Sequence, residues 1–490
     1  MAQIHIHDLT FCYDGSYDNV FEHLTLDLDT DWRLGLVGRN GRGKTTLLRL
    51  LMGELEYRGT ISAPSGFRYF PFPLPAGAAK RDGWAVVHEI DPDCEDWRLE
   101  RELNLLAVDP DLLDRPFGTL SGGERTRVLL ALLFSGDERF LLIDEPTNHL
   151  DHAAREAVCA YLARKRGFLL VSHDRRFLDA CVDHLLVLNK TSVELVQDSF
   201  SGWWAGKQAR DAAELAENEQ LRREIGRLTT AKRRTADWSD KVERSKIGTH
   251  AADRGFIGKK SAKMMQRAKN VERRLDRARS EKEGLLHDVE YQEALKLHPL
   301  THHRDVLVRA RGLTLSYGGR PAVQNLTFEL RSGQCLVLRG RNGAGKSTLL
   351  HRILGAEIET DGLLELASGL VISYVPQDAG GLSGPLDGFL AAGRTDQTLC
   401  KAILRKLGFS RVQFEKPLEQ YSAGQKKKLL LARSLCESAH LYLWDEPLNY
   451  IDIFSRMQLE ELLREFRPTL LMVEHDAAFA DALADQIIEL

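Results

Sequence analysis

Two segments rich in glycine and lysine carry the residue types that bind phosphate. Each follows an apolar run and precedes a helical one, the context of a phosphate-binding P-loop. The glycines let backbone N–H groups turn toward phosphate oxygens, and the start of the helix favours negative charge. The two lysines are expected to balance β/γ-phosphate charge, and Thr45 and Ser347 to ligate Mg²⁺. The predicted nucleotide-binding residues are Gly38, Asn40, Gly41, Gly43, Lys44, Thr45, Thr46, Gly340, Asn342, Gly343, Gly345, Lys346, Ser347 and Thr348.

Further polar residues that could act on a bound nucleotide end apolar runs in both halves of the chain: Asp144, Glu145, His173, Asp445, Glu446 and His475. The aspartates are predicted Mg²⁺ partners, and the glutamates that follow them would polarise the attacking water. The histidines would contact the γ-phosphate or hold that water. This set supplies the positioning and charge stabilisation that phosphoryl transfer requires. For either glutamate alone, capping of the next helix is the alternative.

These motifs belong to an internal repeat. Residues 38–46 read GRNGRGKTT and residues 340–348 read GRNGAGKST, and the other repeated motifs are LSGGE at 120–124 with YSAGQ at 421–425, and DEPTNHLD at 144–151 with DEPLNYID at 445–452. They recur in one order at an offset of 301 or 302 residues. We therefore expect two copies of one domain, over 1–200 and 301–490, with a linker over 201–300.

The apolar runs predict the fold class. Residues 140–144 (FLLID) and 168–174 (FLLVSHD) have counterparts at 441–445 (LYLWD) and 470–476 (LLMVEHD). Such runs, separated by helical stretches, predict an α/β fold with a mainly parallel sheet covered by helices. Ligands of such sheets bind beyond the strand C-termini, where the polar residues fall.

The linker concentrates positive charge. Residues 221–280 hold 19 Lys or Arg against 7 Asp or Glu, although the whole chain has a net charge of -4. Leu221, Ile225 and Leu228, and later residues at alternating steps of four and three, predict two long amphipathic helices in an antiparallel hairpin with its tip at about 241–262. A helical hairpin with a basic tip is suited to bind a polyanion such as nucleic acid. A solvated charged helix is the alternative.

The motifs LSGGE and DEPTNHLD, with a downstream histidine, resemble those of ATP-binding-cassette (ABC) ATPases in both copies. The resemblance implies that ATP and Mg²⁺ are the cofactors and that the cassettes pair head to tail, so that each signature faces the other P-loop. Ser121 and Gly123 would then face Lys346, and Ser422 and Gly424 would face Lys44. The implied signature residues are Ser121, Gly122, Gly123, Glu124, Ser422, Ala423, Gly424 and Gln425.

The same resemblance implies that Tyr13 and Tyr317 stack on adenine, with edge-strand packing as the alternative, and that Gln377 is a Q-loop ligand of Mg²⁺. Two departures make the sites unequal. Phe72 stands where the first copy should have glutamine, and the second signature has Tyr421 for leucine and Ala423 for glycine. Both sites are expected to bind ATP, with turnover in doubt at the Lys44 site.

Paired cassettes with a charged helical linker resemble the ABC-F proteins, ATPases that act on ribosomes. The segments KIGTHAADRGFIGKKSAKMMQRAK, YSAGQKKKLLLARSL and WDEPLNYIDIFSRMQ look like the Lsa-type antibiotic-resistance branch. The resemblance implies binding to large-subunit rRNA and tRNA near the exit and peptidyl-transferase sites, and displacement of lincosamides, pleuromutilins and streptogramin A. The implied tip residues are Arg254, Phe256, Ile257, Lys259 and Lys260. For Phe256 and Ile257, packing back onto the hairpin is the alternative.

The composition argues against a membrane-spanning protein and against a disulfide-bonded one. The longest apolar run, Val128 to Phe134, is far shorter than the roughly 18–20 residues of a membrane span. Seven scattered cysteines without a CxxC pair predict reduced thiols in a cytoplasmic protein. We expect no membrane partner and a monomer in which the two copies pair. The alternatives are a housekeeping ABC-F translation factor, the ATPase subunit of an importer, and a cassette-type DNA-repair ATPase.

Overall fold

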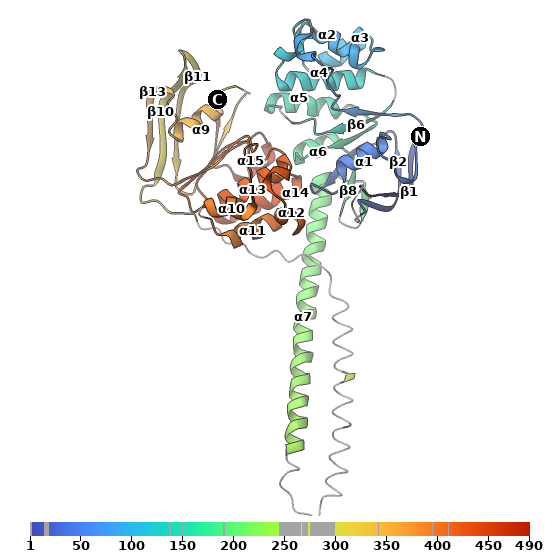
Figure 1. Ribbon diagram of the computed structural model, residues 1–490, viewed down its shortest axis with the longest axis vertical. Helices are drawn as coiled ribbons and strands as arrows, with labels where there is room; N and C mark the ends of the chain where they lie inside the picture. The colour runs from blue at the N-terminus through green and yellow to red at the C-terminus, as the bar shows by residue number, and fades with distance from the viewer. Residues whose placement is uncertain are drawn as a thin grey trace, which may run out of the picture. The chain divides into compact units, whose positions relative to one another are not determined.

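The computed structural model describes residues 2–13, 19–136, 139–148, 150–189, 192–244, 266, 273–274, 299–341, 343–393, 395–409 and 411–490. The chain divides into two compact units, one of residues 1–201 with 294–490 and one of residues 202–293. The first unit holds both sequence repeats. We call the elements up to β9 the first copy and those from β10 onward the second copy (Figure 1).

The first copy alternates strands and helices. Its strands are β1 (Gln3–Phe11), β2 (Phe21–Asp29), β3 (Arg33–Gly38), β4 (Arg58–Ser62), β5 (Phe67–Phe70), β6 (Phe140–Asp144), β7 (Phe168–Val171), β8 (His184–Leu188) and β9 (Val193–Val196). Its helices are α1 (Lys44–Leu51), α2 (Gly83–Ile90), α3 (Asp96–Leu105), α4 (Gly122–Ser135), α5 (His152–Leu162) and α6 (Arg175–Cys181), with 3-10 turns η1 (Ala78–Lys80), η2 (Pro110–Asp114) and η3 (Phe117–Thr119).

The second copy repeats this order. Its strands are β10 (Val306–Tyr317), β11 (Arg320–Arg331), β12 (Cys335–Arg339), β13 (Glu359–Leu366), β14 (Ile372–Val375), β15 (Leu441–Asp445), β16 (Leu470–Val473) and β17 (Gln486–Glu489). Its helices are α9 (Lys346–Ile353), α10 (Leu386–Ala392), α11 (Gln397–Lys406), α12 (Arg411–Glu415), α13 (Ala423–Cys436), α14 (Ile453–Phe466) and α15 (Ala477–Leu483), with the 3-10 turn η5 (Leu418–Gln420).

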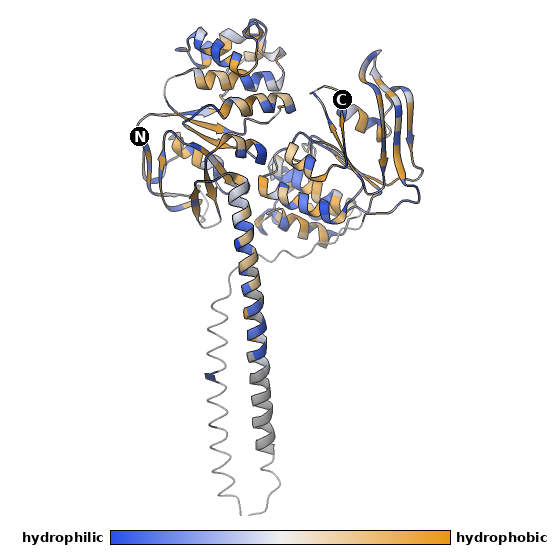
Figure 2. Cartoon of the chain, turned by 180° about the vertical axis from the view of Figure 1, so that it is seen from behind, coloured by the Kyte–Doolittle hydropathy of each residue, from blue (hydrophilic) through white to orange (hydrophobic). Residues whose placement is uncertain are grey.

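Each copy contains a parallel sheet that carries the P-loop strand. The strand orders are β5-β6-β7-β3-β8-β9 and β14-β15-β16-β12-β17, and only the β8–β9 pairing is antiparallel. Strands β7 and β16 are buried at every residue, as the continuous apolar runs predict. The predicted α/β fold, with a mainly parallel sheet in each of the two copies, is confirmed. In Figure 2 the colour of hydrophobic residues predominates along these strands in both copies.

Each copy also contains a three-stranded antiparallel sheet that the sequence reading did not predict. The orders are β2-β1-β4 and β11-β10-β13, and the pairing of β1 and of β10 with both neighbours is interrupted by register shifts. Those shifts break the strict alternation of buried and exposed residues by which such strands are recognised. In the second copy this sheet packs on α9 through Leu349, Leu350 and Ile353 (Figure 1).

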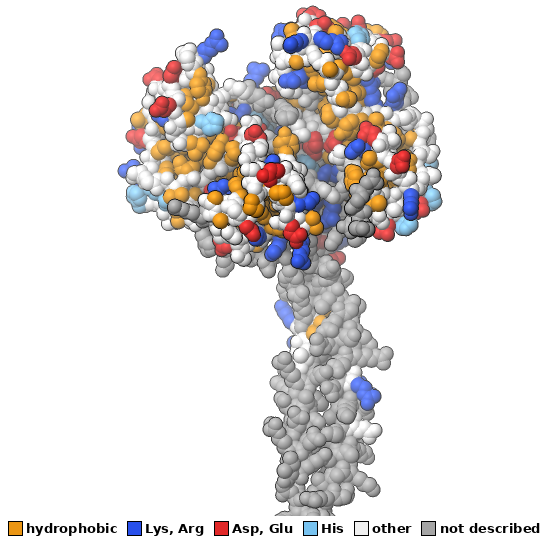
Figure 3. Space-filling model, in the orientation of Figure 1, with side chains coloured by type: hydrophobic (Ala, Val, Ile, Leu, Met, Phe, Trp, Pro, Cys, Tyr) orange, Lys and Arg blue, Asp and Glu red, His pale blue; other side chains and the backbone are white. Residues whose placement is uncertain are grey.

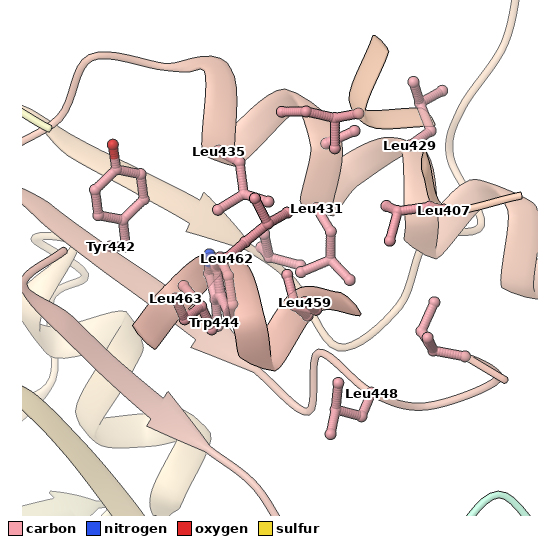
Figure 4. Close-up of a cluster of buried hydrophobic side chains, with 14 of the residues drawn as sticks. Leu407, Leu429, Leu431, Leu435, Tyr442, Trp444, Leu448, Leu459, Leu462 and Leu463 are labelled. Carbon is pink, nitrogen blue, oxygen red and sulfur yellow. The ribbon is translucent and has the colours of Figure 1, made fainter. Parts of the chain in front are cut away.

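The helices of the second copy enclose a separate apolar cluster on the parallel sheet. Trp444 on β15 is fully buried and lies among Leu431 and Leu435 of α13 and Leu459 and Leu462 of α14 (Figure 4). Its indole Nε1 donates a hydrogen bond of 2.9 Å to Ser434 Oγ, so the polar edge of the ring is satisfied inside the core. This packing fixes α13 against the strand that ends at Asp445.

Helix α7 (Phe200–Arg244) runs for 45 residues, about 68 Å at 1.5 Å per residue. It includes the first predicted helix of the linker hairpin, and its last residues, 241–244, fall within the predicted tip range. The second predicted helix and the predicted tip residues Arg254, Phe256, Ile257, Lys259 and Lys260 lie outside the described residues. No helix in the described part of the chain is long and apolar enough to cross a membrane.

Candidate ATP sites

The first P-loop joins β3 to α1 through left-handed glycines. Gly41 and Gly43 have φ angles of 83° and 91°, and Gly43 is the N-cap of α1 without a side-chain hydrogen bond to the first turn. A Cβ on Gly43 would lie 2.6 Å from Val20 Cγ1, so only glycine fits. With no side-chain cap, the first N–H groups of α1 are available to an anion.

Lys44 is buried at the start of this helix. Its Nζ donates to Gly38 O at 2.7 Å and lies 3.4 Å from both Arg39 O and Asn40 Oδ1. Burial lowers the pKa of Lys44, while nearby carboxylates, chiefly that of Asp452, act in the opposite direction. The ammonium is thus held by backbone acceptors at the mouth of the loop, where phosphate oxygens would enter.

The predicted Mg²⁺ side of this site forms at the end of β6. Asp144 Oδ2 lies 3.5 Å from Thr45 Oγ1 and accepts a hydrogen bond of 3.2 Å from the Tyr69 hydroxyl. Burial raises the pKa of the Asp144 carboxyl. The sequence reading missed Tyr69. Phe72 is not among the residues that line the cavity, and the Arg68 guanidinium lies 5.1 Å from the centre of its ring.

Glu145 and His173 meet beside Lys44. Glu145 Oε1 lies 3.3 Å from His173 Nε2, and Glu145 is held in a left-handed conformation with φ 50°. Burial and then the charge of Asp144 raise the pKa of Glu145 to about 8. Burial and the charge of Lys44 lower the pKa of His173 well below its ordinary value. The pair therefore lies in a low-dielectric setting that disfavours charge on both groups.

The second copy supplies one wall of this first site. A cavity of about 760 Å³ is lined by residues of the first copy and by Ser422, Ala423, Gly424 and Tyr450. Asn40 Nδ2 donates to Tyr450 O at 3.0 Å. The structure thus brings the second signature to the Lys44 P-loop. Tyr13 lines the same cavity, with its hydroxyl 2.8 Å from Thr46 Oγ1.

The second P-loop has the same two left-handed glycines as the first and, in addition, a positive φ at Gly340. Gly340, Gly343 and Gly345 have φ angles of 142°, 85° and 86°, and α9 begins at Lys346. Lys346 Nζ donates to Gly340 O at 2.8 Å and Arg341 O at 2.9 Å. Burial lowers the pKa of Lys346. Asn342 lies outside the described residues.

The cavity at the second P-loop differs from the first in the residues that the other copy contributes to its lining. It measures about 470 Å³ and contains Tyr317, Ser347, Thr348, Gln377, Glu446 and His475 of the second copy. The first copy contributes Thr147, Asn148, Leu150, Arg155 and Asp174. None of the described residues that line it belongs to the first signature, 121–124. The expected approach of Ser121 and Gly123 to Lys346 is therefore not seen, whereas that of Ser422 and Gly424 to Lys44 is.

Acid and base groups of the second site lie at the ends of β15 and β16. Glu446 Oε2 accepts from Asn449 Nδ2 at 2.7 Å, and Glu446 Oε1 lies 3.9 Å from His475 Nε2. Burial raises the pKa of Asp445. Burial and the charge of Lys346 lower the pKa of His475 to about 4.

Both signatures begin a helix with the same reciprocal cap. Ser121 Oγ accepts from Glu124 N at 3.2 Å, and Glu124 Oε2 accepts from Ser121 N at 2.7 Å. Ser422 and Gln425 make the same two bonds at 3.3 and 3.0 Å. Each serine therefore fixes the first turn of its helix. The unusual Tyr421 is buried, and its hydroxyl donates to Gln413 O at 2.7 Å.

These residues fit a magnesium-bound nucleotide. Asp445 Oδ1 and His475 Nε2 are buried without a hydrogen-bond partner among the described residues, and such atoms normally have one. One is a carboxylate oxygen suited to Mg²⁺, and the other a ring nitrogen suited to a phosphate or water. When bound, ATP supplies the γ-phosphoryl group that is transferred to water.

The fold and these sites define an ATP-binding-cassette ATPase. A family model described as ABC transporter matches residues 21–148 and 323–449, so the chain belongs to this family and carries its ATP-binding domain in two copies. It binds nucleotide and hydrolyses ATP.

Three relatives are ABC-F proteins to which the chain is homologous over 96% of its length. The ATP-binding protein Uup of Caulobacter vibrioides is 30% identical, with 74% of that protein covered. The ribosome protection protein VmlR of Bacillus subtilis is 28% identical, with 83% covered. The energy-dependent translational throttle protein EttA of Haemophilus influenzae is 26% identical, with 89% covered.

Solved structures share the fold. The chain matches the archaeal ribosome recycling factor aABCE1, in its complex with ribosomal stalk protein aP1, with a TM-score of 0.64 at 20% identity over 98% of this chain and 87% of that one. It matches a structure entitled RNase-L Inhibitor with a TM-score of 0.62 at 20% identity over 99% and 87%.

Proposed function

We propose that this protein is a ribosome-associated ABC-F ATPase that protects the ribosome from antibiotics. The observation that carries the proposal is the seating of Ser422, Ala423 and Gly424 opposite the Lys44 P-loop, because a site built from both copies couples nucleotide to their pairing. The names of VmlR and EttA place those relatives at the ribosome and in translation. We further propose that the protein is a cytoplasmic monomer with domains over 1–200, 201–300 and 301–490.

The linker is the proposed contact with RNA. Residues 221–280 hold 19 basic against 7 acidic residues. By contrast, basic and acidic side chains are interspersed on the visible face of the two copies (Figure 3). Contacts to RNA phosphates give affinity with little sequence choice. We propose that the tip approaches the peptidyl-transferase centre, where tRNA and rRNA lie, and frees lincosamides, pleuromutilins or streptogramin A.

In each ATP site we assign nucleotide binding, Mg²⁺ binding and orientation of the attacking water to different side chains. We assign nucleotide binding to the P-loop residues and to Tyr13 and Tyr317, and the Mg²⁺ contacts to Thr45, Asp144, Ser347, Gln377 and Asp445. Glu145 and Glu446 would orient the attacking water. His173 and His475 lie within 4 Å of these glutamates and would hold that water or a phosphate oxygen. Hydrolysis would reopen the paired copies and permit release.

Trapping on ribosomes tests this function. The double variant Glu145→Gln, Glu446→Gln should bind ATP without turnover and sediment with ribosomes at moderate salt when ATP is present. Adding Lys44→Ala and Lys346→Ala should return the protein to the supernatant, because nucleotide no longer holds the copies together. A trapped variant that stays free of ribosomes would refute the proposal.

A housekeeping role in translation is the second candidate, favoured by the likeness to the energy-dependent translational throttle protein EttA. In vitro translation inhibited by lincomycin or tiamulin separates the two roles. Titrating in the wild-type protein should restore synthesis if it protects ribosomes, and leave inhibition unchanged if it does not. Phe256→Ala or Ile257→Ala should abolish rescue and preserve ATPase activity.

A further inference from the structure

A lysine that the mechanism above does not use is buried between the two ATP sites. Lys427 lies on α13, and 1% of it is exposed. Its Nζ donates to three backbone carbonyls, Pro376 O at 2.7 Å, Gln377 O at 3.2 Å and Asp445 O at 3.1 Å. An ammonium has three N–H donors, so these three acceptors satisfy it completely. A buried cation held in this way costs free energy to displace from any of its partners.

Two of the three acceptor residues, Gln377 and Asp445, are predicted Mg²⁺ contacts of the Lys346 site. Gln377 lines the cavity at that P-loop, and Asp445 ends β15 with one carboxylate oxygen unpaired. Pro376 and Gln377 directly follow β14. Lys427 therefore joins two of the three segments that carry the predicted Mg²⁺ contacts of the second copy, those of Gln377 and Asp445, to a single helix.

That helix begins at the other ATP site. Ser422 caps α13, and Ala423 and Gly424 line the cavity of Lys44. Lys427 follows Gly424 by three residues, which is about one helical turn. A displacement of Gln377 or Asp445 would thus act on Lys427, which lies within one turn of the signature that faces Lys44.

The first copy lacks this connection. Alignment of LSGGE with YSAGQ places Thr126 where the second copy has Lys427. The Thr126 hydroxyl donates to Gly122 O at 3.0 Å, within its own helix α4. A threonine side chain is also too short to span the gap that a lysine spans. Among the described residues, the contacts of Lys427 thus connect the Lys346 site with the signature that faces Lys44, and Thr126 makes no such connection in the first copy.

We propose that Lys427 is a positioning residue that transmits the state of the Lys346 site to the signature facing Lys44. Occupancy of the Lys346 site then raises the ATP affinity of the Lys44 site. The inference depends on the ATPase fold and not on the ribosome, so the two proposals can fail separately.

The test measures the affinity of the Lys44 site with the other site intact or emptied by Lys346→Ala. Photolabelling with 8-azido-ATP, followed by mass spectrometry, resolves the two sites because labelled peptides containing Tyr13 and Tyr317 differ. With Lys427 present, Lys346→Ala should raise the half-saturating concentration at the Tyr13 peptide by about 5-fold or more. With Lys427→Met, the same change should shift it by less than about twofold.

Two further variants distinguish a loss of coupling between the two ATP sites from a general loss of structure. Lys426→Met, at the half-buried neighbouring position, should keep the full shift. Lys427→Gln retains an amide donor and should keep part of the shift in half-saturating concentration. This variant also provides the test if Lys427→Met fails to fold. A full shift in both Lys427 variants would overturn the proposal, as would loss of the shift in Lys426→Met.

Discussion

A second buried lysine, next to Lys427, shows how single residues hold this fold. Lys428 Nζ donates to Asp452 Oδ2 at 2.6 Å and to Leu407 O at 2.8 Å, and Asp452 caps α14 through Ser455 N. Burial alone would raise the pKa of Asp452, but the charge and hydrogen bond of Lys428 outweigh it and lower that pKa. The carboxylate of Asp452 therefore stays charged inside the protein, although burial lowers the pKa of its partner Lys428.

Breaking this pair should be costly. Lys428→Met leaves the Asp452 carboxylate buried without its cation, and we expect a loss of about 3–5 kcal/mol in the free energy of unfolding at pH 7. Urea unfolding followed by circular dichroism measures it. Lys426→Met is the matched control and should change stability by less than about 0.5 kcal/mol. Equal stability of the two variants would show that the pair contributes nothing.

Glu102 should make stability depend on pH. It is buried on α3, with Tyr161 Oη at 2.7 Å and Lys165 Nζ at 2.5 Å. Burial alone would raise the pKa of Glu102, but hydrogen bonds from Lys165, Tyr161 and Arg101 outweigh it and lower that pKa. Its stabilisation is therefore complete above the ordinary value of 4.5 and is lost as the pH falls through the lower folded value.

We expect Glu102→Gln to cost about 2 kcal/mol at pH 7, since hydrogen bonds to charged groups contribute about 1.5–3 kcal/mol. The difference from the wild type should remain constant down to about pH 5 and then shrink. Urea titrations across this range measure it. A difference that instead grew in acid would contradict the assignment.

The sequence predicted the site residues whose roles follow from local motifs. The glycines, lysines and strand-end carboxylates fall where P-loops and parallel strands require them. Tyr69, Tyr450 and Lys427 could not be predicted, because their contacts depend on segments far apart in the chain. YFPF in place of YVPQ marked a changed first site through Phe72, but the tyrosine is common to both motifs and gave no signal for the contact of Tyr69 with Asp144.

At the scale of elements, the start of the second signature helix, α13, needs a close backbone approach. A Cβ on Gly424 would lie 2.5 Å from Tyr450 O and 3.3 Å from Asn40 Nδ2. These atoms belong to the wall of the Lys44 cavity. The repeated motifs predicted this helix and its cap, but the antiparallel sheets were missed because register shifts hide their alternation.

Gly424→Ala should therefore impair the Lys44 site specifically. Overpacking against a backbone carbonyl costs about 1–3 kcal/mol, so ATP affinity there should fall by about 5- to 150-fold. Photolabelling of the Tyr13 peptide measures this. Gly66→Ala is the control, because a Cβ there meets open space at an ordinary backbone conformation. Normal labelling of the Gly424→Ala variant would place the signature elsewhere.

At the scale of the whole molecule, polar contacts join the two copies. Arg155 Nη1 donates to Asp174 Oδ2 at 3.0 Å and across the interface to His475 O at 2.9 Å. Arg175 pairs with Glu460, which is 7% exposed, and Arg176 pairs with Asp481 at 2.7 Å in a more exposed setting. Only the buried contacts should contribute strongly to pairing.

Arg175→Ala should weaken pairing more than Arg176→Ala. The first leaves Glu460 buried with only Arg464 as a partner and should cost about 2 kcal/mol, while the second should cost less than about 1 kcal/mol. Energy transfer between fluorophores on the two copies, titrated with ATP, reports pairing. The reverse order of effects would show that burial does not set the strength of this interface.

Helix α7 begins at Phe200, whose ring centre lies 6.3 Å from that of Phe454 in the second copy. Its first residue therefore contacts the second copy, and the helix continues without a break to Arg244. At about 68 Å in length, a rigid helix tilted by one degree at its root moves its far end by about 1 Å. A small tilt of the first turn would thus become a displacement of about one ångström for every degree at the other end of the helix.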